Sequence, residues 1–169
     1  DLPVTPMQST MYLHSMTSGV PGLYCEHVLL DLHGHVDLAR LERAWQHVVD
    51  REPSLRARVH QRDDGALRQQ PDRLTVLVEE VLVDDGDVPA VLDRLVAEDR
   101  ELGFDLAAGP LTWWRLVREP GADRAVLVWT HHHLLVDGWS LPLVLRAVLR
   151  AYADDVGPAV GAPDSPGTD

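Results

Sequence analysis

The stretch that decides the fold is residues 129–140, which read Trp-Thr-His-His-His-Leu-Leu-Val-Asp-Gly-Trp-Ser. The apolar run over residues 125–129 leads into it and is typical of a buried strand. Three imidazoles at the end of such a strand are costly to bury unless each finds a partner. Alternation along the strand directs His131 and His133 to one face of the sheet and His132 to the other. We therefore expect a functional site here, with the rest of the chain as its scaffold.

The residues after the histidines predict a tight turn that leads into a helix. Gly138 permits a positive φ or a close approach of backbone, and Ser140 is a good N-cap. The helix that follows carries an apolar stripe made of Leu141, Val144, Leu145, Val148 and Tyr152. The expected site thus lies between the end of a strand and the N-terminus of a helix.

Length and charge narrow the class of protein. The chain has 169 residues, which is most simply one domain. Its net charge of −12 argues against nucleic acid and anionic membranes as partners. All 15 basic residues are Arg, which excludes lysine Schiff-base and P-loop chemistry.

Cysteine usage and hydropathy indicate the compartment. The single cysteine, Cys25, rules out an intrachain disulfide and a metal cluster built from cysteines. The sequence shows no signal peptide and no apolar run near the ~18 residues that a membrane span requires. We therefore expect a soluble protein with a cytoplasmic location.

Start and stop signals divide the first part of the chain into elements. Thr5-Pro6 predicts a helix start, with Met7 and Met11 facing inward. Asp37 is expected to cap a second helix, which ends near Arg51 because a proline follows shortly after it. Strands are expected over residues 24–32 and 55–59.

The second part of the chain alternates in the same way. Asp63-Asp64-Gly65 is a hairpin signal, Asp87 is expected to cap a helix, and Gly103 to end it. Further strands are expected over residues 74–83, 111–118 and 125–131. Interleaved helices and strands with two hairpins predict an α/β (α+β) sandwich with a mixed sheet. We expect one lobe over residues 1–155 and a flexible tail or linker over residues 156–169.

The histidine cluster has three interpretations. Three His and one Asp make a plausible zinc ligand set, but His131 and His132 point in opposite directions on a strand and would need a bulge to share an ion. Alternatively, His132 and His133 are satisfied core residues, and Asp137 only caps the turn.

The third interpretation is acid–base chemistry at one imidazole. Histidine exchanges a proton near neutral pH, and a helix N-terminus offers backbone N–H groups to a developing oxyanion. A base at His133 would take the proton of an incoming amine or hydroxyl, while donors near Gly138 receive the carbonyl oxygen. This interpretation favours acyl transfer with no metal.

Four stretches of the chain resemble the core motifs of one known family. Residues 132–138, His-His-Leu-Leu-Val-Asp-Gly, resemble the H-H-x-x-x-D-G motif of the condensation domains of nonribosomal peptide synthetases. Chloramphenicol acetyltransferase-like enzymes and epimerization domains share versions of this motif. The other three stretches resemble family motifs in the family's order, namely residues 5–15, 50–59 and 104–111.

The resemblance implies a fold and a reaction. The fold is the N-terminal lobe of a chloramphenicol acetyltransferase-like enzyme, in which a mixed sheet carries packed helices. The reaction is amide formation between a donor peptidyl or aminoacyl thioester and an acceptor aminoacyl thioester, both held on carrier proteins. Such domains serve antibiotic biosynthesis and secondary metabolism.

The resemblance also assigns residues. It makes His133 the catalytic residue, as a base or as a group that positions the amine, with His132, Asp137 and Gly138 as supporting motif residues. Asp137 is expected to pair with an arginine of the second motif. The candidates for this salt bridge are Arg51 and Arg56.

The expected partners follow from the same family. They are the donor and acceptor peptidyl carrier proteins and a C-terminal lobe, with no nucleic acid and no membrane. No cofactor is expected to bind directly, because the substrates are carried on the phosphopantetheine of the carrier proteins. The family's second lobe has no counterpart in the chain, so we expect little activity from the chain alone and an exposed apolar patch.

Several alternatives stay open at the level of sequence. Residues 134–143 resemble domains whose donor ends in a D-residue more than those that take an L-residue donor. An epimerization domain, an acyltransferase with a free acceptor, and a non-catalytic lobe that binds carrier proteins are the competing functions. The second motif departs from the family pattern, because Glu52-Pro53 stands where His-Glu is usual.

Overall fold

A computed structural model describes residues 2–84 and 86–155, so the expected tail over residues 156–169 lies outside the described part. The helices are α1 (Pro6–Ser18), α2 (Leu38–Arg51), α3 (Val88–Leu102) and α4 (Leu141–Ala153), with a short 3-10 helix, η1 (Pro53–Arg56). The strands are β1 (Leu2–Pro3), β2 (Cys25–His33), β3 (Ala57–Gln61), β4 (Leu67–Pro71), β5 (Val78–Leu82), β6 (Thr112–Arg118) and β7 (Arg124–His132).

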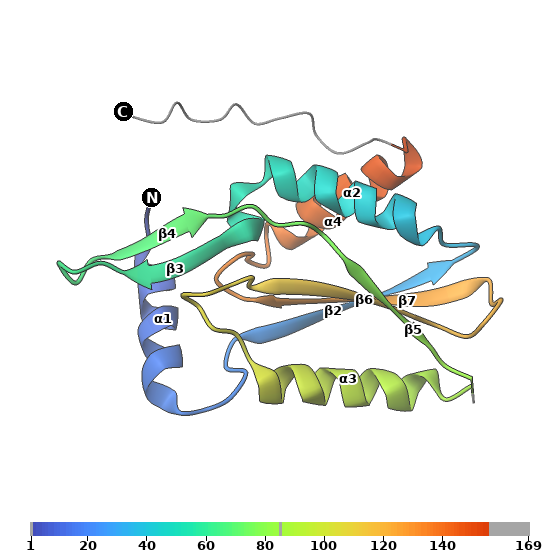
Figure 1. Ribbon diagram of the computed structural model, residues 1–169, viewed down its shortest axis with the longest axis horizontal. Helices are drawn as coiled ribbons and strands as arrows, with labels where there is room; N and C mark the ends of the chain where they lie inside the picture. Colours follow the sequence, from blue (N-terminus) through green and yellow to red (C-terminus); the bar gives the residue numbers. More distant parts are fainter. Residues whose placement is uncertain (1, 85, 156–169) are drawn as a thin grey trace.

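The main sheet has the strand order β2-β7-β6-β5 (Figure 1). Strands β5 and β6 are parallel, whereas β7 is antiparallel to both of its neighbours, so the sheet is mixed, as predicted. The hairpin at residues 61–67 joins β3 and β4, which form a separate sheet with the order β1-β4-β3. The long strand β7 lies inside the main sheet and is therefore held on both sides.

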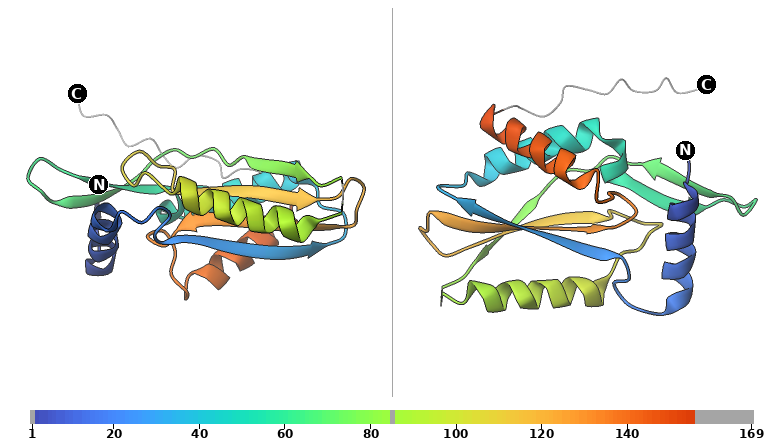
Figure 2. Two further views of the ribbon diagram at one scale, coloured as in Figure 1. Left: turned by 90° about the horizontal axis from the view of Figure 1, so that it is seen from below. Right: turned by 180° about the vertical axis from the view of Figure 1, so that it is seen from behind.

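Helices cover both faces of the main sheet. Helix α3 lies against one face, and helices α2 and α4 lie against the other (Figures 1 and 2). The side chains of β7 alternate between these two layers, because successive residues of a strand point to opposite faces. Leu127 and Trp129 join the core under α2 and α4, and Val128 joins the smaller core under α3.

The larger core is centred on a fully buried tryptophan of α2. The ring of Trp45 packs against those of Trp114 and Trp129, at centroid distances of 5.2 and 4.8 Å. Truncation of such a side chain to Ala costs about 3–5 kcal/mol of stability. The cluster fixes α2 against the two central strands and thereby fixes the position of the end of β7.

The expected helix signals are confirmed. Thr5 and Gln8 form a capping box at the start of α1, and the carboxylates of Asp37 and Asp87 cap α2 and α3. Helix α2 ends at Arg51, as the nearby proline predicts. Within the described residues, no helix combines the length and the apolar content that crossing a membrane would need.

Some expected features were wrong in detail. Met11 is buried, but Met7 is exposed, so α1 packs over a narrower face than the methionine spacing suggests. The strand expected over residues 55–59 begins as η1, and the strand expected over residues 74–83 begins only at Val78. In the latter segment, the side chain of Gln46 binds Leu74 O and Val76 N, which replaces strand pairing there.

Candidate active site

The last residues of β7 carry the histidines to the edge of the protein. Strand β7 ends at His132, which lies opposite Cys25 of β2. Its backbone N–H donates to Leu111 O (3.0 Å), and the N–H of His133 donates to Tyr24 O (2.9 Å). The backbone on both sides of the strand thus fixes where the two histidines point.

His131 and His132 are buried on opposite faces, as strand alternation predicts. Burial, followed by the charge of His133, lowers the pKa of each imidazole to about 4. The Nδ1 atom of His132 accepts a hydrogen bond from the N–H of Leu134 (3.1 Å), so the proton of this neutral ring is on Nε2. Both rings are therefore neutral at physiological pH and support the site without exchanging protons.

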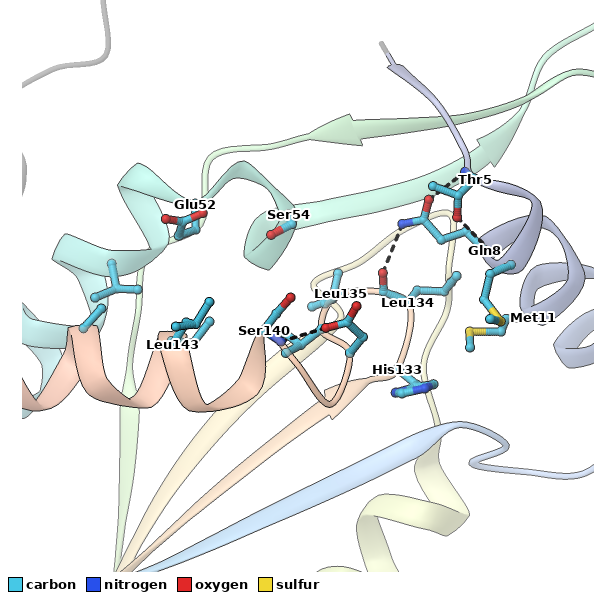
Figure 3. Close-up of a pocket in the computed structure, with 16 residues that line it drawn as sticks. Thr5, Gln8, Met11, Glu52, Ser54, His133, Leu134, Leu135, Ser140 and Leu143 are labelled. Atoms are coloured by element: carbon cyan, nitrogen blue, oxygen red, sulfur yellow. Dashed lines mark hydrogen bonds between the residues drawn. The ribbon is translucent and has the colours of Figure 1, made fainter.

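His133 is the histidine of the cluster that reaches the surface. Its side chain is 29% exposed, and it lines a pocket of about 530 Å³ at the end of the sheet. Figure 3 shows it at the end of the β7 ribbon, between Met11 of α1 and Ser140 at the start of α4. The position of His133 agrees with the role that the sequence assigns to it.

The pocket is built from segments far apart in the sequence. Gln8 of α1 donates through Nε2 to Leu134 O (3.1 Å) and so ties the first helix to the loop after β7 (Figure 3). The rim includes exposed apolar side chains, among them Met7 and Leu143, and Trp139 is exposed beside it. The lining residues that Figure 3 labels are Thr5, Gln8, Met11, Glu52, Ser54, His133, Leu134, Leu135, Ser140 and Leu143.

Asp137 is exposed and holds the turn before α4. Its Oδ1 accepts hydrogen bonds from the backbone N–H groups of Ser140 (2.7 Å) and Trp139 (3.1 Å). Hydrogen bonds from Ser140 are the main cause of a pKa below the usual value of this carboxyl. The expectation that Ser140 caps α4 was wrong, because its side chain makes no capping hydrogen bond and Asp137 satisfies the backbone instead.

The expected salt bridge between Asp137 and Arg51 or Arg56 is absent from the described residues. The guanidinium of Arg56 instead donates to Val49 O (3.3 Å) and Asp72 O (2.9 Å). Arg51 is exposed at the end of α2. The physical reason is that an exposed carboxylate with two backbone donors needs no buried cation.

The start of α4 does not supply a free oxyanion hole. The N–H groups of Trp139 and Ser140 bind the Asp137 carboxylate, and that of Leu141 binds Asp137 O. The expectation of oxyanion donors near Gly138 therefore fails for these three groups. In the described part of the chain, the cluster also gives no group of three residues placed to hold a metal ion.

Sequence reasoning missed two residues that touch the histidines. Glu26 of β2 lies opposite His131, and its carboxylate reaches both His131 and His133. Tyr24 has a φ of 63°, a conformation that is uncommon for a bulky residue. A lone acidic residue in a largely apolar strand was the available signal for Glu26, whereas nothing in the sequence marks the φ of Tyr24.

Comparison with known proteins decides the family. The profile of the Condensation domain family matches residues 1–157, which is most of the chain. The chain belongs to the condensation-domain family. It corresponds to the N-terminal portion of such a domain, as the four motifs predict.

Curated relatives of this condensation-domain portion are large synthetases. One chain of the linear gramicidin synthase of Brevibacillus parabrevis is 32% identical over 160 residues, which cover 92% of the chain described here and 3% of the relative. Bacitracin synthase 3 of Bacillus licheniformis is 34% identical over 156 residues, 89% of the chain and 2% of the relative. The chain therefore spans a very small part of the synthetases that it matches.

Solved condensation domains share the fold. The starter condensation domain of rhizomide synthetase gives a TM-score of 0.81 at 21% identity, over 94% of the chain and 39% of the solved chain. The first condensation domain of the calcium-dependent antibiotic synthetase gives 0.80 at 20% identity, over 95% and 41%. The predicted α/β sandwich with a mixed sheet is confirmed as the fold of the N-terminal condensation lobe.

Proposed function

We propose that the chain is the N-terminal lobe of a nonribosomal peptide synthetase condensation domain that forms an amide bond between two carrier-bound thioesters. One observation carries the proposal. His133 alone of the three histidines lines the pocket, on a turn that Asp137 and the backbone of Tyr24 hold in place. A single accessible imidazole between a strand end and a helix start suits proton transfer or positioning at one reacting centre.

In the proposed reaction, the amine of the acceptor aminoacyl thioester attacks the carbonyl carbon of the donor thioester. The new N–C bond forms, the C–S bond breaks, and the donor phosphopantetheine leaves as a thiol. His133 accepts the amine proton or orients the amine for attack, and the proton passes to the leaving sulfur. No step requires a nucleophilic side chain or a directly bound cofactor.

The proposed partners are the donor and acceptor peptidyl carrier proteins and the C-terminal lobe of the domain. Exposed apolar side chains at the pocket rim, Met7, Leu143 and nearby Trp139, are a surface that a second lobe would cover. The donor subtype is proposed from the motif itself, because residues 134–143 resemble domains that accept a donor ending in a D-residue.

The test uses the complete condensation domain that contains this chain, with separately loaded donor and acceptor carrier proteins. His133→Ala should reduce amide formation by about 10²–10⁴-fold and leave the melting temperature nearly unchanged, because the side chain is partly exposed. His33→Ala, a change at a 75% exposed histidine of β2, is the matched control and should retain full activity.

Donors ending in a D-residue and an L-residue are compared in the same assay. Faster transfer of the D-donor supports the subtype. Release of an epimerized donor without an amide product would replace the proposal with an epimerization domain. Full activity of the His133→Ala variant would favour a lobe that only binds carrier proteins.

A further inference from the structure

The carboxylate of Glu26 lies between two histidines of the cluster. Its Oε2 atom is 3.1 Å from His133 Nδ1 and 3.5 Å from His131 Nε2. The side chain of Glu26 is 46% exposed, so it keeps contact with solvent while it faces both rings. No motif singles out this residue, which comes from an edge strand far from the histidines in sequence.

Within the described residues, Glu26 is the acidic group in contact with the buried side of the His133 ring. His133 Nδ1 is buried and has no hydrogen bond of standard geometry, although its distance to Glu26 is in the range of N–H···O bonds. Asp137, the other nearby carboxylate, is engaged with backbone N–H groups. The exposed part of the His133 ring is therefore not at Nδ1.

His131 holds the second side of this arrangement. Its ring stacks on Trp129, with centroids 4.5 Å apart and planes at 21°, and it is almost fully buried. Burial keeps the ring neutral, so it offers the carboxylate one N–H at most. The distances place the Glu26 oxygen nearer to His133 than to His131, which favours the interaction with His133.

The backbone keeps Glu26 and His133 in register. Glu26 pairs with His131 in the β2–β7 ladder, and two residues earlier Tyr24 O accepts the N–H of His133 (2.9 Å). The ring of Tyr24 also lies 5.9 Å from that of His132. The segment that carries the carboxylate is thus the same segment that anchors the histidine turn.

We propose that Glu26 is a positioning residue for His133. An ionised carboxylate only accepts hydrogen bonds, so it selects the tautomer of His133 with the proton on Nδ1. Nε2 then carries the lone pair, which can accept the proton of the acceptor amine. This inference rests on the proposed function for its catalytic consequence, but the choice of tautomer follows from the geometry alone.

The tautomer is tested first, in the 169-residue chain. Nitrogen-15 NMR of labelled histidines at neutral pH should show His133 protonated at Nδ1. In Glu26→Ala the ring should shift to the Nε2–H form that free imidazoles favour, and Glu26→Gln should keep part of the Nδ1–H population, because its amide oxygen still accepts. Asp31→Asn, which removes a charge of similar exposure from the same strand, should change nothing.

Catalysis is tested second, in the complete condensation domain. Glu26→Ala should lower kcat for amide formation by about tenfold or more, with little change in KM, and Glu26→Gln should recover part of the loss. An Nε2–H tautomer in the unmodified chain, or a tautomer that ignores Glu26→Ala, overturns the proposal whether or not the domain forms peptides. An unchanged kcat in an active Glu26→Ala domain also overturns it, whereas a domain that makes no amide refutes only the proposed function.

Discussion

The carboxylate of Asp137 accepts a 2.7 Å hydrogen bond from the backbone N–H of Ser140. With the bond from Trp139, it closes the turn that connects the histidines to α4. The aspartate of the motif thus acts on the backbone of its own loop, and it does so from the surface of this lobe. The position of His133 depends on this turn on one side and on strand β2 on the other.

Removal of the Asp137 carboxylate should loosen the turn. We expect Asp137→Ala to lower the melting temperature by about 2–4 °C, a typical effect of a lost cap in a domain of this size. Asp137→Asn keeps an acceptor oxygen and should lose less. Thermal unfolding followed by circular dichroism measures both variants, and equal melting temperatures for Ala and the unmodified chain would refute the capping role.

The buried histidines should make stability depend on pH. The pKa of His131 is about 4 in the folded chain, mainly because of burial, and about 6.5 in the unfolded chain. The unfolded state therefore binds the proton first, so the contribution is complete above about pH 7 and is lost as pH falls from about 6.5 to 4. The loss is on the order of 3 kcal/mol for this residue.

His131→Phe tests this dependence, because it keeps a ring against Trp129 and removes the proton site. Urea unfolding at several pH values should show a shallower fall in stability between about pH 7 and 4 than in the unmodified chain. The same change at the exposed His33 should leave the slope as it is. Identical slopes for all three chains would show that His131 is already protonated in the fold.

A buried aspartate of α3 holds that helix to the sheet. Asp99 accepts hydrogen bonds from Thr130 Oγ1 (2.7 Å) and Arg115 Nη1 (2.6 Å), and His27 Nε2 lies 3.4 Å away. Burial alone would raise the pKa of this carboxyl, but the bonds from His27, Thr130 and Arg115 outweigh it and hold the pKa well below its usual value. The pair stabilises the fold above about pH 4, and that stability is lost as pH falls below this value.

We expect Asp99→Ala to destabilise the chain by about 3–5 kcal/mol, because it leaves Arg115 without its buried partner. Glu98→Ala, at the neighbouring position of the same helix, removes an exposed pair with Arg94 and should cost less than about 1 kcal/mol. Chemical denaturation compares the two variants. A similar, small loss for both would mean that solvent screens the Asp99 network.

Gly22 lets the loop before β2 approach the end of α3. A Cβ atom there would lie 2.2 Å from Arg100 O, at a φ of +64°. Gly19 has nearly the same φ, +65°, but its Cβ would meet nothing within 4 Å. The two positions therefore separate backbone strain from steric overlap.

Gly19→Ala should cost about 1–2 kcal/mol, the usual penalty of a left-handed conformation. Gly22→Ala should cost at least about 1 kcal/mol more, because it also forces the loop away from α3. The loop leads directly to Tyr24, so the pocket should widen as well. Equal losses of stability in urea unfolding would show that the contact between the loop and α3 is soft.

The elements of the fold could be predicted because their signals are local. Caps such as Thr5, Asp37 and Asp87 place their helices correctly, since a cap acts within one turn of its own helix. The opposite orientation of His131 and His132 follows from strand alternation and is confirmed. The segment before β5 was misjudged because Gln46, on a distant helix, binds its backbone.

The sequence by itself determined the histidine-bearing strand, the turn after it and the family, because these depend on short-range geometry and on a contiguous motif. Only the tertiary structure decided the partners of the site. It placed Glu26 beside His133, gave Arg56 to backbone carbonyls, and left Asp137 in solvent. Contacts between distant segments depend on strand register and on which groups burial leaves without a partner, and both are set only when the whole core packs.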